Sequence, residues 1–403
     1  MIRGRLVREK GFQQSGHGVA IFLLLAAVFL LSPNCKAQDK PAFKIEENIT
    51  RFAFSPGGRI AYATRHVFSI KNIQLQRDDI WSCEKGCNNP RMLLSGEKFT
   101  RGSGPFSYTV RALRWSPDGK RLTAELGTSQ MVNDVGDTRE GVMTLLLDDA
   151  GKQIVIAGAD SVIPGAVNAT WMADDASVVY LTALQPKPQP PFSEQPPKSD
   201  QDIAFLMNRV RPVAGPGSPV FPGVTFAAVA WNATKNAGIA VERDEYAAIP
   251  PLPGPARLVA LDLARGTSLP LASLEGYAGG LSISPSGKKV AYWIDNEQLE
   301  VRDIDAPNRM ARVRVAVGTL AWSGDETRAL VKRGPALRAG GLAWVALPPL
   351  AVVAAGAAPA TADAAPQSVL HDLEFRQFDI SPDGRSLAVV EPGRRNLLVY
   401  PVS

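Results

Sequence analysis

Short apolar runs recur along the chain, and each is followed by a tight-turn sequence and then by a second apolar run. Seven copies of this pattern are present: RFAFSPGGRIAYAT, ALRWSPDGKRLTAEL, ATWMADDASVVYLT, AVAWNATKNAGIAVE, LSISPSGKKVAYWI, LAWSGDETRALVKR and FDISPDGRSLAVVE. An apolar or aromatic residue stands at the entry to each turn, namely Phe54, Trp115, Trp171, Trp231, Ile283, Trp322 and Ile380. Seven copies exclude coincidence, although three of the turns are degenerate.

Each copy predicts a β-hairpin. Aromatic and β-branched residues suit the half-buried face of a strand. In Ser-Pro-Asp-Gly the Pro presets φ, the Asp bonds back to the turn backbone and the Gly accepts a positive φ. Further strand-like runs follow several hairpins, such as DDIWSCE with PRMLLSG and EQLEVRDID with ARVRVAV. Four antiparallel strands make one propeller blade, and blades must stack to bury their faces. We therefore expect an all-β, closed β-propeller of seven four-stranded blades, with six or eight as alternatives.

The two ends of the chain predict how the ring closes. The last copy supplies three strands, whereas residues 42–49 precede the first hairpin and have no partner of their own. We expect residues 42–49 to pair near Asn396 to Val402 as the outer strand of the last blade. Such pairing of the termini would leave no open strand edge.

The hairpins resemble the TolB-type, WD-repeat-like propeller repeat, which also occurs in prolyl-oligopeptidase-like and dipeptidyl-peptidase-like proteins. The resemblance covers nearly all of residues 38–403 and rests on a short, common motif. It implies a fold more than a function. TolB itself has an α/β domain before its propeller, and the peptidases add an α/β-hydrolase domain. We expect neither domain here, and hence a propeller protein that is not TolB proper.

The N-terminal segment predicts export. A basic stretch precedes thirteen consecutive apolar residues, VAIFLLLAAVFLL, at residues 19–31, and Cys35 and Ala37 follow. This order is typical of a signal peptide. Thirteen helical residues rise about 20 Å, which is too short for a hydrocarbon core of about 30 Å. We expect a signal peptide over 1–37, cleavage after Ala37 and a periplasmic or extracellular propeller over 38–403. An uncleaved anchor and a lipid anchor at Cys35 remain alternatives.

Charge argues against a nucleic-acid partner. Residues 1–37 carry five basic residues and one acidic residue, a net +4 of the chain's +5, so the remainder carries 5 − 4 = +1. A nearly neutral protein lacks the electrostatic footprint that nucleic-acid binding requires.

Three stretches interrupt the repeat. The segments 185–200 and 211–223 are rich in proline and are expected to run as exposed loops. The segment 347–366 predicts one strand and then a flexible Ala-rich linker near 352–366. The first Pro-rich loop could dock a partner, but a tolerated surface insertion is the favoured interpretation.

Residues with reactive side chains are few. After cleavage, histidine occurs at His66 and His371, and neither has other ligands at metal-binding spacing. No Gly-x-Ser-x-Gly elbow, phosphate loop or dinucleotide fingerprint occurs. A loop with Asn133, Asp134, Asp137 and Glu140 lacks the spacing of a calcium loop, and we interpret it as a solvated turn. The sequence thus predicts no catalytic, cofactor-binding or metal-binding residue.

The remaining cysteines form one motif, WSCEKGC. Cys83 and Cys87 flank a three-residue turn candidate between the third and fourth strands of the first blade. In an oxidising compartment they should form a disulfide, whereas the spacing does not fit a redox-active Cys-x-x-Cys pair.

These observations predict a non-catalytic exported propeller that binds an unknown protein or a cell-envelope component, with no cofactor and no stable membrane span after cleavage. The alternative is an enzyme, such as a lyase, lactonase or glycan hydrolase, with its site in the central channel. Convergent acids, His or Arg at one mouth of the channel would favour the enzyme, and a bland channel would favour the binding protein.

Overall fold

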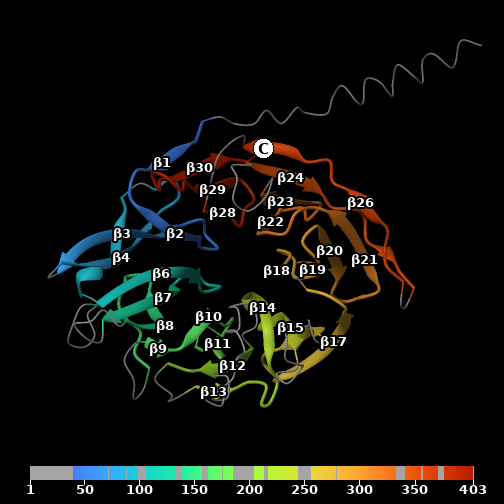
Figure 1. Cartoon of the computed structure of the whole chain (residues 1–403), viewed down its shortest axis with the longest axis horizontal. Coiled ribbons are helices and arrows are strands. Elements are labelled where there is room, and N and C mark those ends of the chain that lie inside the picture. Colours follow the sequence, from blue (N-terminus) through green and yellow to red (C-terminus); the bar gives the residue numbers. More distant parts are fainter. Residues whose placement is uncertain are drawn as a thin grey trace, which may run out of the picture. The chain divides into compact units, whose positions relative to one another are not determined.

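The computed structural model describes residues 40–402 with internal gaps. The gaps are residues 71, 88, 99–105, 132–137, 157–161, 175, 185–203, 213–216, 244–255, 278, 333–340, 355–356 and 371–375. The predicted signal peptide and its cleavage point therefore lie outside the described residues. Within the described part the chain is almost entirely β-structure (Figure 1), with short 3-10 turns at Gly96–Lys98 and Ala233–Lys235. The all-β prediction is confirmed.

Among the described residues the strands form two sheets of four strands, one of six and two of eight. A single residue pair joins the two halves of each eight-stranded sheet, Arg77 with Tyr108 and Phe205 with Phe226, so for description we divide these sheets there and number the resulting strand groups in chain order. The first group contains β2 (Ile49–Phe54), β3 (Ile60–Ile70), β4 (Ile73–Cys83) and β5 (Arg91–Leu94). The second contains β6 (Phe106–Trp115), β7 (Arg121–Met131), β8 (Thr138–Asp148) and β9 (Val162–Pro164). The third contains β10 (Ala166–Trp171), β11 (Val178–Ala183), β12 (Phe205–Val210) and β13 (Ser218–Pro219). The fourth contains β14 (Phe226–Asn232), β15 (Ala237–Arg243), β16 (Ala256–Asp262) and β17 (Thr267–Leu274).

The fifth group is again built from consecutive strands, whereas the sixth and seventh each include one strand that is not next in the chain. The fifth contains β18 (Gly279–Ile283), β19 (Lys289–Trp293), β20 (Gln298–Asp303) and β21 (Arg309–Arg314). The sixth contains β22 (Leu320–Trp322), β23 (Arg328–Lys332), β24 (Leu342–Ala346) and β27 (Gln367–Leu370). The seventh contains β28 (Gln377–Ile380), β29 (Ser386–Val390), β30 (Leu397–Pro401) and β1 (Phe43–Ile45).

The pairing of the chain ends is confirmed. Strand β1 runs antiparallel to β30, with Phe43 opposite Val399 and Ile45 opposite Leu397. The sequence alone indicated this partner because the last hairpin lacked a fourth strand. In Figure 1 the blue β1 and the red β30 lie side by side.

Each group packs against its neighbours because alternate residues of a strand point to opposite faces. The described residues contain a hydrophobic cluster at every junction between consecutive groups. A further cluster joins Phe52 and Tyr62 of the first group to Val390 and Val399 of the seventh. The core is therefore distributed over the junctions between groups.

The repeated turn is held by its serine and aspartate. Ser116 Oγ donates to Asp118 Oδ1 at 2.5 Å and accepts from the Arg121 N–H at 2.9 Å. Other copies repeat the serine–aspartate bond, with Ser323 to Asp325 and Ser381 to Asp383. These hydroxyls and nearby N–H donors lower the pKa of Asp325 and of Asp383 to about 2. Local hydrogen bonding thus explains why Ser and Asp recur in the turn sequence.

The tryptophans at the turn entries link neighbouring groups. Trp171 is 1% exposed, and its buried indole N–H has no partner within the described part of the chain. The other three indole N–H groups donate to the innermost strand of the preceding group, as Trp115 to Ala53 O (3.3 Å), Trp231 to Asn168 O (2.7 Å) and Trp322 to Ser282 Oγ (3.0 Å).

Two of the segments expected to be loops contain strands. Within 211–223, Ser218–Pro219 pairs with β12, and Phe221 is 5% exposed in the core. The segment 347–366 contains the one predicted strand, β25 (Ala351–Val352), and also β26 (Thr361–Asp363) within the expected linker, and both pair with β21 of the fifth group. The sequence Thr-Ala-Asp of β26 has no strand pattern of its own, so only its pairing with β21 makes it a strand. The first Pro-rich loop, 185–200, lies outside the described residues.

No helix in the described part of the chain is long and apolar enough to cross a membrane.

Candidate functional site

Main-chain and side-chain bonds hold the first and seventh groups together at their innermost strands. Gln377 of β28 donates its amide to Phe52 O at 2.9 Å and accepts from Phe52 N–H at 3.2 Å. At the end opposite the Ser-Pro turns, Ile49 N–H donates to Arg395 O at 2.8 Å. The segment around residue 48 therefore meets the segments around 376 and 395, although it lies more than three hundred residues from both in the chain.

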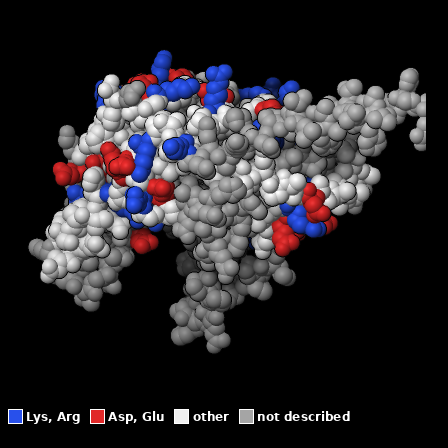
Figure 2. Space-filling model, turned by 90° about the horizontal axis from the view of Figure 1, so that it is seen from above, with Lys and Arg blue, Asp and Glu red and all other residues white. Residues whose placement is uncertain are grey.

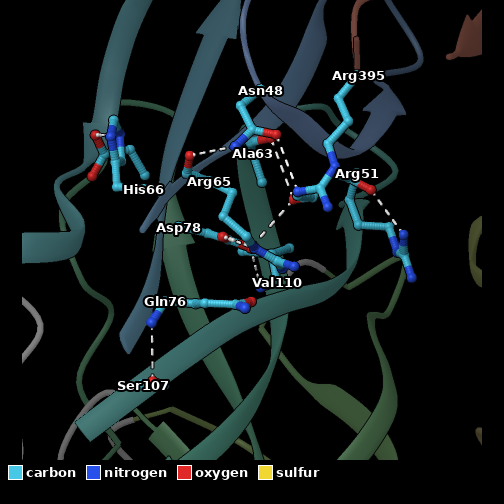
Figure 3. Close-up of polar contacts among 12 residues, drawn as sticks. Asn48, Arg51, Ala63, Arg65, His66, Gln76, Asp78, Ser107, Val110 and Arg395 are labelled. Atoms are coloured by element: carbon cyan, nitrogen blue, oxygen red, sulfur yellow. Dashed lines mark hydrogen bonds and ion pairs between the residues drawn. The ribbon is translucent and has the colours of Figure 1, made fainter. Parts of the chain in front are cut away.

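A buried ion pair lies directly beside this junction (Figure 3). Asp78 is 0% exposed, and Arg65 donates to both of its oxygens at 2.8 and 3.0 Å. The N–H of Val110 and the hydroxyl of Thr50 also donate to Asp78, at 2.7 and 3.2 Å. With four donors, this carboxylate is fully engaged, and it joins the first group to the second.

Three more arginines surround this pair. Arg51 lies on β2 and donates to Arg111 O at 2.7 Å, while Arg395 donates to Asn48 Oδ1 at 3.1 Å. Arg376 is exposed and precedes β28. We name Arg51, Arg65, Arg376 and Arg395 the arginine cluster.

The cluster shows electrostatic strain. Burial, followed by repulsion from Arg65 and Arg376, lowers the pKa of Arg51. Burial, followed by repulsion from Arg376 and Arg65, lowers the pKa of Arg395. Arg65 alone of the four is bonded to Asp78, and Asp78 and Glu125 are the acidic groups that act on Arg51, so the arginines outnumber the carboxylates here and an approaching anion would relieve the repulsion.

A second polar group lies on the outer side of the same hairpin. His66 Nε2 is 2.9 Å from Asp79 Oδ2, and the His66 side chain is 59% exposed. The Gly96 N–H donates to the other Asp79 oxygen. Partial burial raises the pKa of Glu47, with Asp79 adding to the rise and His66 opposing it. His66 is therefore an exposed, hydrogen-bonded side chain, and His371 lies outside the described residues.

The β3–β4 hairpin carries apolar side chains near its tip. Val67 is 49% exposed and Ile70 is 39% exposed, and the Arg77 guanidinium lies 4.6 Å from the centre of the Phe68 ring. Both strands of this hairpin are eleven residues long. The arginine cluster thus has exposed apolar residues on the same hairpin, a combination typical of protein-binding surfaces.

The remaining sequence predictions have mixed outcomes. The structure contains the Cys83–Cys87 disulfide, with a Cα–Cα distance of 4.8 Å, in the turn between β4 and β5. Asn133, Asp134 and Asp137 lie outside the described residues, and Glu140 is exposed on β8. No group of three metal-ligating side chains lies together among the residues described.

Sequence reasoning missed the arginine cluster. Arg51 stands four residues before Ser55 and Arg376 five residues before Ser381, each at the start of its hairpin. Aligning the copies on that serine would have placed these two arginines at similar positions. Arg65 and Arg395 belong to different strand ends, so only the packing of the groups brings them together.

The surface of the described part carries both charges. Figure 2 shows Lys and Arg interspersed with Asp and Glu on the face that it draws, in keeping with the small net charge. A local cluster of arginines is therefore a feature of one junction and does not reflect a generally basic protein.

The strand groups define the class of fold, which is that of a WD-repeat-like β-propeller. No family model and no curated protein sequence match the chain. Among solved structures, the β-propeller domain of Cps50 (Swd1) from Myceliophteria thermophila aligns over 90% of this chain and 100% of its own, with a TM-score of 0.52 and 11% identity. The C-terminal WD40 domain of Sif2 aligns over 90% and 98%, with a TM-score of 0.46 and 12% identity. At 11% identity the match to the Cps50 domain shows a shared fold alone, and a specific relation to TolB-type repeats stays a prediction.

Proposed function

We propose that the protein is an exported, closed propeller of seven blades that acts as a non-catalytic scaffold and binds an acidic segment of another protein. Seven four-stranded groups and the hydrophobic cluster between the first and seventh groups support the closed ring. WD40 propellers commonly bind proteins, which supports a scaffold. The basic, apolar-rich N-terminal segment supports export.

The arginine cluster is the observation that carries the binding proposal. Arg51 and Arg395 have pKa values lowered by burial and by neighbouring arginines, so the free protein holds like charges close together. A carboxylate-rich segment would neutralise them through charge-assisted hydrogen bonds. Val67 and Ile70, exposed on the adjoining hairpin, would add apolar contacts.

Charge reversal tests this proposal. The probe is a fluorescent, Glu-rich dodecapeptide, and the readout is anisotropy at about 0.15 M salt. The test variant carries Arg376→Glu and Arg395→Glu. The control carries Arg265→Glu and Arg309→Glu, which reverse the same number of exposed charges on the fourth and fifth groups.

We expect the test variant to bind at least about tenfold more weakly than the parent, since each charge-assisted bond is worth about 1.5–3 kcal/mol. The control should stay within about twofold. Equal loss in both variants would show a response to net charge, and unchanged binding in the test variant would exclude this surface. If the protein bound an anionic envelope polymer more tightly than the peptide, the partner of this surface would be such a polymer and not an acidic protein segment.

Export has its own test. N-terminal sequencing of the protein recovered outside the cytoplasm should begin at Gln38. Recovery of protein that retains residues 19–31 would favour the uncleaved anchor, and a lipid-modified Cys35 would favour a lipoprotein.

The enzyme alternative has one observation in its favour, namely that arginines converge at one end of the strands. A propeller enzyme would also need an acid–base group, and His66 with Asp79 is the nearest pair. His66→Gln should leave peptide binding unchanged if the surface is a scaffold. If the purified protein turned over a lactone or glycan substrate and this substitution abolished the turnover, the enzyme would be the correct interpretation.

A further inference from the structure

A large open cavity lies between the fourth and fifth groups, away from the arginine cluster. Its volume is about 1010 Å³. The wall from the fourth group is the end of β17, including Leu271 and Leu274. The wall from the fifth group carries polar side chains of β19, β20 and β21, namely Tyr292, Glu300, Arg302 and Arg312.

The polar wall is built on the strand register. Tyr292 lies directly opposite Glu300, and Glu300 lies directly opposite Arg312. Glu300 is 1% exposed and accepts hydrogen bonds from the Tyr292 hydroxyl, from Arg302 at 2.6 Å and from Arg312 at 2.9 Å. These partners lower the pKa of Glu300 against the effect of burial, so the carboxylate is charged.

The wall has more donors than acceptors. Two guanidinium groups offer ten N–H donors, whereas the one buried carboxylate is already shared by three side chains. Arg302 is 8% exposed, and its terminal nitrogens donate to Pro307 O at 2.5 Å and to Glu300 at 2.6 Å, whereas its Nε has no hydrogen-bond partner among the described residues. Arg312 uses its Nε for Glu300, and its side chain is 22% exposed beside the cavity. An unsatisfied buried donor is costly, and the pair of arginines leaves one uncompensated positive charge.

Much of the remaining lining is apolar, with Ser273, Asn308, Glu275 and Asp295 as its other polar residues. Leu271, Leu274 and Ile294 face it together with Met310 and Val352. Leu271 is 8% exposed, and Val352 is 71% exposed at the rim. A ligand that fits both walls therefore needs one anionic end and an apolar body.

We propose that this cavity binds a small organic acid with one carboxylate and an apolar chain or ring. The carboxylate pairs with Arg312, while Arg302, which is held by Glu300 and Pro307, adds its positive charge to the wall. The apolar body lies against Leu271, Met310 and Val352. A monoanion fits better than a multiply charged phosphate because Glu275 and Asp295 are exposed at the rim of the cavity. This site is independent of the proposed scaffold surface.

The experiment is a calorimetric titration of the purified protein with sodium octanoate and, separately, with uncharged 1-octanol. Arg312→Gln removes the charge that faces the cavity and keeps a donor for Glu300. Arg314→Gln is the control, because Arg314 lies on the same face of β21 without lining the cavity. Val352→Trp fills the cavity from its exposed rim and leaves the buried network intact.

We expect saturable octanoate binding to the parent and at least about tenfold weaker binding of 1-octanol. Arg312→Gln should weaken octanoate binding by about tenfold or more, because a charge-assisted hydrogen bond is lost, whereas Arg314→Gln should stay within about twofold. Val352→Trp should block octanoate binding. If Arg312→Gln does not fold, the Val352→Trp variant alone tests whether octanoate binds in this cavity. Absence of saturable octanoate binding to the parent, equal affinity for 1-octanol, or unchanged binding in either cavity variant would overturn the proposal.

Discussion

Deleting residues 40–46 removes β1 and tests whether the chain ends stabilise each other. In the intact protein Ala42 N–H donates to Val399 O at 2.7 Å, and Phe43 to Ile45 pair with Val399 to Leu397. At roughly 1 kcal/mol for each backbone hydrogen bond, the lost ladder is worth about 3 kcal/mol. Loss of the partly buried Phe43 and Ile45 side chains adds about 1 kcal/mol each.

The expected result is a melting temperature about 10 °C lower than that of the parent, at about 2 °C for each kcal/mol in a domain of this size. The deleted protein should also associate more readily, because the edge of β30 is left unpaired. Circular dichroism monitors thermal unfolding, and light scattering at several protein concentrations measures association. The deletion leaves Asn48 and the arginine cluster in place.

Deleting residues 187–193 is the matched control. It removes the same number of residues from the Pro-rich segment, and loop shortening changes the closure entropy by well under about 1 kcal/mol. Equal melting temperatures for the two deletions would refute the reasoning, since β1 would then contribute nothing that a loop does not.

Three further predictions concern single side chains. In urea unfolding, Trp115→Phe should lower the free energy of unfolding by about 1 kcal/mol more than Trp171→Phe, because only the Trp115 indole loses a hydrogen bond to the neighbouring group. Equal losses in the two variants would contradict a stabilising role for the Trp115 hydrogen bond. Burial raises the pKa of Asp379 to about 6, so the cost of ionising it in the folded protein grows as the pH rises from about 4 and is complete above 6. Asp379→Asn should therefore raise the melting temperature at pH 7.5 and have little effect at pH 4. An effect of the same size at both pH values would be inconsistent with burial as the cause. Replacing Cys83 and Cys87 by Ser should cost about 2 kcal/mol, and mass spectrometry without reduction should find both cysteines of the native protein unavailable for alkylation.

The hairpin pattern made the fold class predictable because it is a local property. Each Ser-Pro-Asp-Gly-like turn is stabilised within a few residues, as Ser116 with Asp118 shows. The closing strand at residues 42–49 was predictable by counting, since the last hairpin lacked one partner. The Cys83–Cys87 bond was predictable because the two residues are four apart in the sequence.

The candidate site was not predictable in the same way. Arg65 lies directly opposite Asp78 within the β3–β4 hairpin, but Arg395 belongs to the seventh group, and only the packing of that group against the first brings Arg395 near them. The strand β26 escaped prediction for a related reason. Its pairing energy comes from β21, which lies far earlier in the chain, and not from its own apolar content.

By itself, the sequence determined the β-hairpins, their turns, the local disulfide and the need for a partner strand at the N-terminus. These features depend on residues that are close in the chain, where propensity and turn chemistry act directly. Only the tertiary structure decided which charges lie together at the arginine cluster and at the Glu300 cavity. Electrostatic and cavity properties depend on distances between side chains of different groups, and those distances are set by how the groups pack.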